Sequence, residues 1–245
     1  MIFSKEQIYI VTGASSGIGQ AIALKLNERG ASVVAIARSL EKLNATKVLS
    51  KYPDNFYIEQ KDLVENIEDL PNYVCELKKK YGKFSGLACV AGIDIISPLQ
   101  MLNIEDIKKT FSLNYEVPLF LSKGFADRRN NIGEGSSVVF ITSIAGINPD
   151  KGQCVYGGSK AALIAATKAI SKELSPRKIR CNCISPAWVE TPMYHKQKEL
   201  IGVNENDYAL GIGQPVDVAN LSAYLLSDDA RWITGQNYVI DGGKL

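Results

Sequence analysis

The chain has little of what metal sites and disulfides are made of. It contains one histidine, His195, and five cysteines, none of them in a C-x-x-C pair. Cys181 and Cys183 stand two apart in an apolar run, so on a strand their side chains would point to the same face. This usage is typical of buried, reduced thiols rather than of disulfides or a zinc site. We therefore expect a cytoplasmic protein with no metal site.

An excess of one charge and a long apolar run are also missing. Lysine plus arginine total 28 and aspartate plus glutamate 26, a formal net charge of +2, so no broad basic field attracts nucleic acid. No apolar run approaches the ~18 residues of a membrane-spanning helix, and Met1 to Gln7 lacks the apolar stretch of a secretory signal. We expect neither nucleic acid nor a membrane as partner.

What the chain does have is enough apolar material for one large core. Of its 245 residues 46% are hydrophobic, and at this size roughly 70–75% of the unfolded chain's surface is buried on folding. The sequence contains no internal repeat, no low-complexity stretch and no linker. We therefore predict a single domain that covers residues 1–245.

Apolar runs alternate with stretches of helical period along this domain. The predicted strands are 8–11, 32–37, 56–58, 86–90, 138–142, 180–184 and 238–240, and the predicted helices are 18–29, 40–50, 67–81, 104–130, 155–175 and 216–227. Several strands are apolar without alternation, which is typical of a parallel sheet with helices on both faces. We predict an α/β doubly wound (Rossmann) fold with a seven-stranded parallel sheet in the order 3-2-1-4-5-6-7.

The segment 188–213 breaks this rhythm. It is polar, mixed and weakly periodic, so we predict a mobile substrate-binding loop or lid without firm secondary structure. Its apolar residues lie at the start, nearest the end of the sixth strand; they are Trp188, Val189, Met193 and Tyr194. His195 lies in the same segment, and we interpret it as a solvated side chain rather than a base.

A glycine-rich turn joins the first strand to the first helix. Its glycines, Gly13, Gly17 and Gly19, have the spacing G-x-x-x-G-x-G and alternate with Ser15, Ser16 and Ile18. The first glycine suits a tight turn, the second lets the backbone approach a pyrophosphate, and the third lets the helix pack on the strand. A plain structural turn is the alternative, but the position inside a βαβ unit favours a dinucleotide site.

The ends of the next two strands bear on the choice of dinucleotide. An NAD site usually has an acid after the second strand, whereas this chain has Arg38 and Ser39. Arginine can bind a 2′-phosphate through paired hydrogen bonds, so we predict NADP(H); the alternative is that Arg38 is a solvated cation. Asp62 and Leu63 follow the third strand, where Asp62 either accepts the adenine amino hydrogen or caps a turn.

Tyr156 and Lys160 open a long helical run four residues apart, and so share one helix face. An unperturbed tyrosine has a pKa of about 10. A nearby ammonium lowers such a pKa by roughly 1–3 units, so we expect Lys160 to make Tyr156 a usable acid for a carbonyl oxygen and base for an alcohol.

With Ser143 after the fifth strand and Asn114 in the preceding helix, the chain resembles the short-chain dehydrogenase/reductase family over essentially all its length. Further matching segments are Ser185-Pro186-Ala187, Thr191-Pro192, Ile233-Thr234-Gly235-Gln236 and Asp241-Gly242-Gly243. The resemblance implies that Tyr156 donates or accepts the proton and that Lys160 lowers its pKa and binds the nicotinamide ribose. It also implies that Ser143 orients the carbonyl, and that a helix distortion at Asn114 holds a water for proton relay.

The resemblance adds further cofactor contacts and marks two departures. The implied contacts are Cys89, Ala91 and Gly92 after the fourth strand and Pro186, Val189 and Thr191 after the sixth. The family's Asn-Asn-Ala-Gly reads Cys89-Val90-Ala91-Gly92 here, so some hydrogen bonding between sheet and helix has to be replaced. The usual Pro-Gly reads Pro186-Ala187, and alanine is strained if this position needs a positive φ.

By this resemblance the protein is an NADPH-dependent reductase of a small-molecule or carrier-bound ketone, similar to the bacterial 3-oxoacyl-[acyl-carrier-protein] reductases. One alternative is a reductase of a sugar, polyol or specialised ketone, and another is a non-catalytic NADP-sensing protein. The family also implies a homodimer or homotetramer in which the fourth and fifth predicted helices pack between subunits. Small residues on the fifth would allow close approach; they are Ala161, Ala162, Ala165, Ala166 and Ala169.

Overall fold

The computed structural model describes residues 3–244 and has one seven-stranded sheet in the order β3-β2-β1-β4-β5-β6-β7, as predicted. All neighbouring strands are parallel. The strands are β1 (Ile8–Thr12), β2 (Ser32–Ala37), β3 (Phe56–Gln60), β4 (Gly86–Cys89), β5 (Ser137–Ile141), β6 (Arg180–Pro186) and β7 (Asn237–Ile240). Because they are parallel, their carboxyl ends meet at one edge of the sheet.

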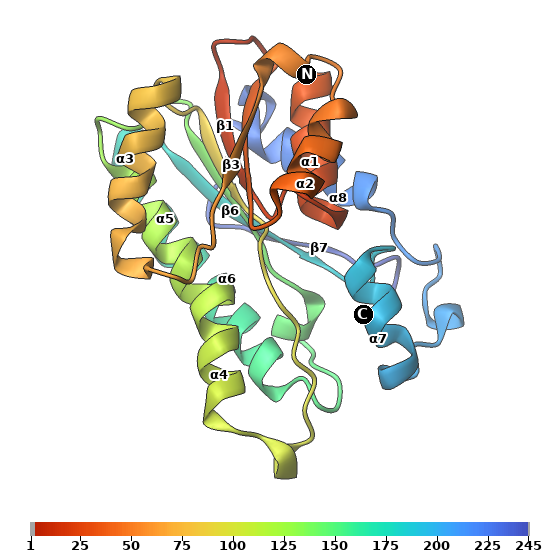
Figure 1. Ribbon diagram of the computed structural model, residues 1–245. Helices are drawn as coiled ribbons and strands as arrows, with labels where there is room; N and C mark the ends of the chain where they lie inside the picture. Colours follow the sequence, from red (N-terminus) through yellow and green to blue (C-terminus); the bar gives the residue numbers. More distant parts are fainter. Residues whose placement is uncertain (1–2, 245) are drawn as a thin grey trace.

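Helices cover both faces of the sheet (Figure 1). The helices are α1 (Gly17–Glu28), α2 (Leu40–Val48), α3 (Leu70–Tyr81), α4 (Ile104–Phe111), α5 (Val117–Ala126), α6 (Cys154–Leu174), α7 (Pro192–Ile201) and α8 (Pro215–Leu226). Alternate strand residues feed two cores: Val11 and Val33 pack with α1, α2 and α8, whereas Ile10 and Val34 pack with α3, α5 and α6. This two-sided burial explains why the strands are apolar without alternation.

The predicted helix 104–130 is wrong as a single element. It divides into α4, a π-helical turn at Ser112–Glu116 and α5, and it ends at Ala126. Pro118 has no N–H to donate to the carbonyl four residues earlier, which locally breaks the α-helical ladder. At the far end, the side chains of Asn130 and Asn131 donate to the carbonyl oxygens of Gly124 and Phe125. Side-chain donors thus satisfy carbonyls that the helix leaves free.

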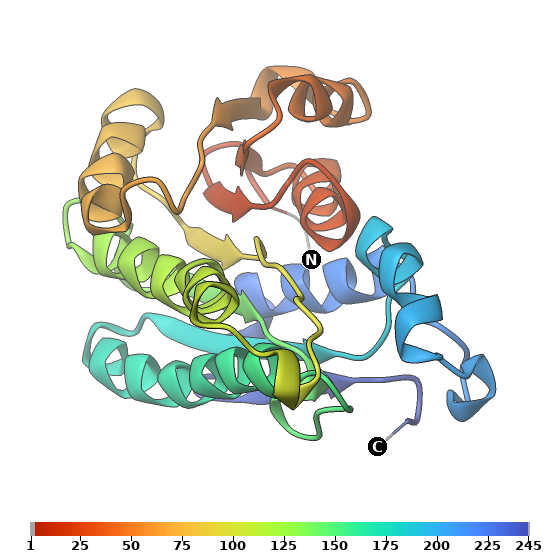
Figure 2. The same cartoon turned by 60° about the horizontal axis from the view of Figure 1, so that its bottom comes forward.

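The expectation of a segment 188–213 without firm structure is also wrong. It contains α7 and a 3₁₀ turn at Glu205–Asp207. The Thr191 hydroxyl accepts a hydrogen bond from the Tyr194 N–H at 3.2 Å, Pro192 begins the helix, and Gly202 ends it with a φ of +70°. Val189 and Gly213 form an isolated parallel bridge. In Figure 2 α7, in light blue, lies at one side of the molecule, and its first residue, Pro192, comes close to Gly17 at the start of α1.

Within residues 3–244 no helix combines the length and the apolar character needed to cross a membrane.

Candidate active site

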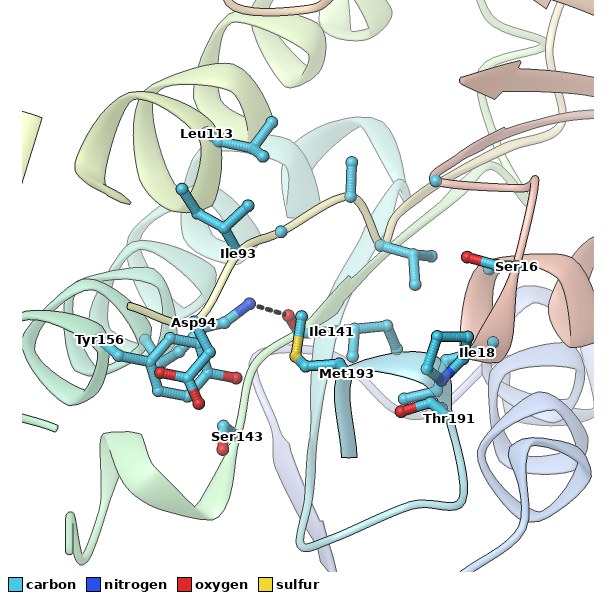
Figure 3. A pocket seen from close by; sticks show the side chains of 18 of the residues that line it. Ser16, Ile18, Ile93, Asp94, Leu113, Ile141, Ser143, Tyr156, Thr191 and Met193 are labelled. Carbon is cyan, nitrogen blue, oxygen red and sulfur yellow. Dashed lines mark hydrogen bonds between the residues drawn. The ribbon is translucent and has the colours of Figure 1, made fainter. Parts of the chain in front are cut away.

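A cleft of about 930 Å³ opens at the carboxyl edge of the sheet. Its lining comes from the segments that follow β1, β2, β3, β4, β5 and β6, together with α6 and the start of α7. This is the edge at which doubly wound sheets bind their ligands. In Figure 3 Ser16, Ile18 and Thr191 lie toward one end of the cleft, and Asp94, Ser143 and Tyr156 toward the other.

The glycine-rich turn forms a close-packed cradle in this cleft. Gly13 and Gly17 have positive φ angles of +67° and +54°, and a Cβ on Gly19 would overlap the carbonyl oxygen of Gly13. Ser16 precedes α1 in an extended conformation without capping its N-terminus through its side chain. The first N–H groups of α1 therefore suit an anionic group. The predicted residues of this turn all line the cleft: Gly13, Ser15, Ser16, Gly17, Ile18 and Gly19.

The predicted residues after β2 and β3 line the same cleft: Arg38, Ser39, Asp62 and Leu63. Two lysines that sequence reasoning missed, Lys42 and Lys61, join them there. Lys42 stands one turn into α2 and Lys61 directly follows β3, so each lies beside a residue that the sequence singled out. The cluster brings three cations together at this end of the cleft.

Ser39 and Asp62 also have structural roles. The Ser39 hydroxyl accepts from the Lys42 N–H at 3.3 Å and so caps α2, and Asp62 Oδ1 accepts from the Val64 N–H at 3.2 Å. The turn-capping interpretation of Asp62 is therefore confirmed, and its adenine contact stays a prediction.

Asn114 lies in the π-helical turn and is buried. Its Oδ1 accepts from the Ile93 N–H at 2.9 Å, and its Nδ2 donates to the Ile93 carbonyl at 2.8 Å and to Ser159 Oγ at 3.1 Å. A Cβ on Gly92 would lie 3.1 Å from Asn114 Oδ1 and 3.5 Å from Lys160 Nζ. The helix distortion thus places Asn114 beside Lys160 and fastens the chain after β4 to α6.

Tyr156, Lys160 and Ser143 come together deep in the cleft. Lys160 Nζ donates to the Ile141 carbonyl at 2.9 Å and lies 5.7 Å from the Tyr156 ring centroid. Burial lowers the pKa of Lys160 to about 8, while the charge of Asp94 opposes this change. The Ser143 hydroxyl accepts from the Ala145 N–H at 3.1 Å, which fixes the start of the turn after β5.

The expected lowering of the Tyr156 pKa by Lys160 is wrong for the protein alone. Burial and the negative charge of Asp94 raise the pKa of Tyr156 above its ordinary value, and a hydrogen bond with Ser143 opposes them. The Lys160 ammonium is directed at the Ile141 carbonyl rather than at the phenol oxygen. Sequence spacing can place the two side chains on one helix face, but it cannot give the direction of the ammonium.

Asp94 is a cleft residue that the sequence interpretation missed. It stands two residues after Gly92, in a segment without regular secondary structure. Burial raises the pKa of its carboxyl to about 6, and the Lys160 ammonium partly opposes this rise. The only available sequence signal is an acidic residue two positions beyond the small pair Ala91-Gly92 that follows β4.

Of the predicted contacts around the end of β4, Cys89 is the one that does not line the cleft. Strand alternation directs its side chain into the core beneath α3, α5 and α6, and burial raises its pKa. Val90 lines the cleft instead, with Ala91 and Gly92. The Thr12 hydroxyl accepts from the Val90 and Ala91 N–H groups at 2.9 and 3.1 Å, so the backbone here is held without the family's amide pair.

The predicted residues after β6 line the cleft: Pro186, Val189 and Thr191. Ala187 carries no strain, because Lys178 is the only non-glycine residue with a positive φ among residues 3–244.

His195 is exposed, outside the cleft lining, and its Nε2 lies 2.8 Å from Glu190 Oε1.

A dinucleotide fits this site on structural grounds. The glycine cradle leaves no room for added Cβ atoms, the N-terminus of α1 lacks a side-chain cap, and three cations surround the far end. These residues would hold the pyrophosphate and the adenosine end of a dinucleotide.

Comparisons with known proteins agree with this geometry. The family profile described as "Enoyl-(Acyl carrier protein) reductase" matches residues 13–244. The 3-oxoacyl-[acyl-carrier-protein] reductase of Rickettsia felis is 35% identical over 96% of this chain and 95% of the relative. The "Tropinone reductase-like 3" protein of Erythroxylum coca is 31% identical over 97% of this chain and 92% of its own length.

Solved structures show the same similarity. A short-chain dehydrogenase/reductase from Brucella melitensis, described as a glucose/ribitol dehydrogenase, superposes with a TM-score of 0.91 at 28% identity, over 100% of this chain and 99% of that one. A short-chain dehydrogenase from Burkholderia cenocepacia, crystallised with NADP, gives a TM-score of 0.88 at 29% identity, over 98% of both chains. The profile match, the relatives and the site together show that this chain belongs to the short-chain dehydrogenase/reductase family and is an NAD(P)-dependent oxidoreductase.

Proposed function

We propose that this protein uses NADPH to reduce a ketone to a secondary alcohol, with Tyr156 as the proton donor. The observation that carries the proposal is that Ser143, Tyr156 and Lys160 line the same cleft as the glycine cradle, with the buried Asn114 behind Gly92 beside Lys160. A purely NADP-sensing protein would not need this complete set.

The side chains divide the work of reduction between them. NADPH, when bound, supplies the hydride. The Ser143 hydroxyl orients the ketone oxygen, and Tyr156 donates a proton to that oxygen as negative charge develops on it. Burial and Asp94 raise the pKa of Tyr156, so the phenol is protonated at neutral pH, which is the state that reduction requires.

Lys160 and Asn114 support this proton transfer. With a pKa near 8, Lys160 is largely charged at pH 7 and can return a proton toward Tyr156 after each turnover. Asn114 holds the backbone beside the lysine through its two hydrogen bonds with Ile93. In this proposal the π-helical turn positions the end of the relay.

The choice of NADP(H) over NAD(H) rests on charge at the far end of the cleft. Arg38 follows β2 where an NAD site has an acid, and Lys42 and Lys61 line the same region. One solved relative is crystallised with NADP. A 2′-phosphate is the group that these cations would bind.

The names of the relatives refer to different substrates, so the identity of the ketone is a separate part of the proposal. There are two candidates: a 3-oxoacyl group on acyl carrier protein, and a sugar, polyol or other metabolite ketone.

Location in the cytoplasm and assembly into a homodimer or homotetramer stay predictions. For assembly, the supporting feature is a row of exposed small side chains along α6: Ala161, Ala165 and Ala169.

The proposal is tested by following NADPH absorbance with a panel of ketones: an acetoacetyl thioester, a set of ketoses, and simple and hydroxylated ketones. We expect NADPH oxidation that depends on the ketone and yields the matching alcohol. If NADPH binds and no ketone in the panel is reduced, the proposal is contradicted.

A further inference from the structure

Asp94 places a carboxylate beside the catalytic groups. Asp94, Ser143 and Tyr156 lie at the same end of the cleft (Figure 3). The Asp94 charge acts on both Tyr156 and Lys160, in agreement with this position.

The position of Asp94 is fixed by its neighbours and not by its own side chain. Both backbone groups of Ile93 are bonded to Asn114, and the Asp94 carbonyl accepts from Gln197 Nε2 of α7 at 2.7 Å. The carboxylate oxygen Oδ1, by contrast, is buried and has no hydrogen-bond partner in the part of the chain that the structure describes.

A buried carboxylate oxygen without a donor is costly, because it loses its water and gains no hydrogen bond in return. The raised pKa of Asp94, near 6, reflects this cost. Among the described residues, the carboxylate accepts no hydrogen bond from a main-chain N–H that could offset this loss of hydration. Such a group is best explained by a ligand that supplies the missing donor.

The chemistry of the donor follows from the surroundings. Lys160 already provides a cation beside Asp94, so an ammonium group on the substrate would meet positive charge, whereas a neutral hydroxyl would not. A 3-oxoacyl thioester offers no donor next to its ketone, because the ketone carbon is flanked by carbon groups on both sides and a second carbonyl, that of the thioester, lies beyond the methylene. That carbonyl oxygen is an acceptor and would be repelled by a carboxylate.

We propose that Asp94 is a specificity-determining residue whose carboxylate accepts a hydrogen bond from a hydroxyl group next to the ketone. The substrate class is then the hydroxylated ketones, such as ketoses and keto forms of polyols, rather than carrier-bound acyl chains. This inference rests on the proposed ketone reduction and names its substrate class.

The test compares two ketones of the same shape, 1-hydroxybutan-2-one and pentan-3-one, in which a methyl group replaces the hydroxyl. A hydrogen bond to a charged group favours the hydroxyketone by roughly 10–150-fold in kcat/KM. Asp94→Ala removes this preference: kcat/KM for the hydroxyketone falls by that factor relative to kcat/KM for pentan-3-one, whatever the common change in both. Asp94→Asn keeps the shape and a weaker acceptor, so it loses part of the preference.

Glu199→Gln is the matched control, because Glu199 is an exposed acid of α7 outside the cleft lining; it leaves the preference unchanged. If Asp94 only supported the fold, its variants would slow both ketones equally. An equal loss for both ketones, or a wild-type enzyme without the preference, overturns the inference. So does fastest turnover of an acetoacetyl thioester that is insensitive to Asp94→Ala.

A binding measurement separates this inference from the proposed function. Saturation-transfer NMR with NADP⁺ present compares butane-1,2-diol with pentan-3-ol on the wild type and on Asp94→Ala. Selective binding of the diol that the variant loses supports the role of Asp94 even if no ketone is reduced, whereas equal signals on both proteins contradict it. Turnover of ketones without a hydroxyl preference contradicts the Asp94 role and leaves the proposed function intact.

Discussion

At the scale of single residues, the ionisation of Asp94 links the active site to stability. Burial raises the pKa of its carboxyl from 3.8 to about 6, and the charge of Lys160 opposes this rise. The charge of Asp94 in turn acts on Tyr156. For an acid whose pKa is raised on folding, the folded state binds the proton more tightly, so stability falls as pH rises from about 4 to 6.

Asp94→Asn is therefore expected to stabilise the protein at pH 7.5. A change of about two pKa units corresponds to at most about 3 kcal/mol, and partial exposure of the side chain reduces the gain to about 1–2 kcal/mol. The difference from wild type shrinks toward zero below pH 4. Urea unfolding at pH 4 and 7.5 measures both values; a variant less stable than wild type at pH 7.5 contradicts this account.

Arg38 is expected to select the cofactor. One charged hydrogen bond to a 2′-phosphate favours NADPH over NADH by roughly 10–150-fold in affinity, and Arg38→Asp should reverse the order because aspartate repels the phosphate and accepts from a ribose hydroxyl. Dissociation constants come from cofactor fluorescence. Lys51→Asp, an exposed lysine outside the cleft, is the control for net charge. Equal affinities for NADPH and NADH in the unmodified protein would contradict the role of Arg38 in selecting the cofactor.

At the scale of elements, α7 is the part of the site most suited to move. Its residues 192–199 belong to neither apolar core, and Tyr194 is the one fully buried side chain among them. Its contacts include a hydrogen bond from the Tyr194 hydroxyl to Glu205 at 2.6 Å and the Gln197 bond to the Asp94 carbonyl. Elements with few buried apolar contacts open at low free energy. A substrate held by Asp94 would strengthen the contact between α7 and the cleft.

Hydrogen exchange checks this expectation. The amides of α7 should exchange faster than those of β1 and β5 in the protein alone. They should gain more protection than any other segment when NADPH and an accepted ketone are both bound. If α7 is already as protected as the central strands without ligand, it is a fixed wall and not a lid.

The elements also show which patterns the sequence reveals. Continuous apolar runs predict the strands well, because burial on both faces leaves no room for polar residues. The helical period of 104–130 does not predict the π-helical turn, because the one local indication of a break in the helix is a single proline, Pro118. Helix α7 was missed because its apolar residues do not form a stripe, although Thr191 and Gly202 mark its two ends.

At the scale of the whole molecule, strand order and the position of the cleft follow from few rules. Parallel strands, right-handed connections and the glycine turn after β1 place the ligand site at one edge, and most of the predicted residues line it. The environment of Asp94 could not be predicted in this way, because Gln197 reaches it from 103 residues away. The direction of the Tyr156 pKa depends likewise on where the Lys160 ammonium points.

The central claim is that this fold assembles a site in which Tyr156 protonates a ketone. The most direct test gives the protein NADPH deuterated at the transferred position of the nicotinamide and a ketone that it accepts. Tyr156→Phe keeps the ring and removes only the proton donor, so alcohol formation should fall by about 10²–10⁴-fold, while NADPH affinity, measured by fluorescence, stays within a few-fold. The wild type should place one deuterium on the carbinol carbon. Near-normal turnover of Tyr156→Phe, or product without deuterium, would contradict the account.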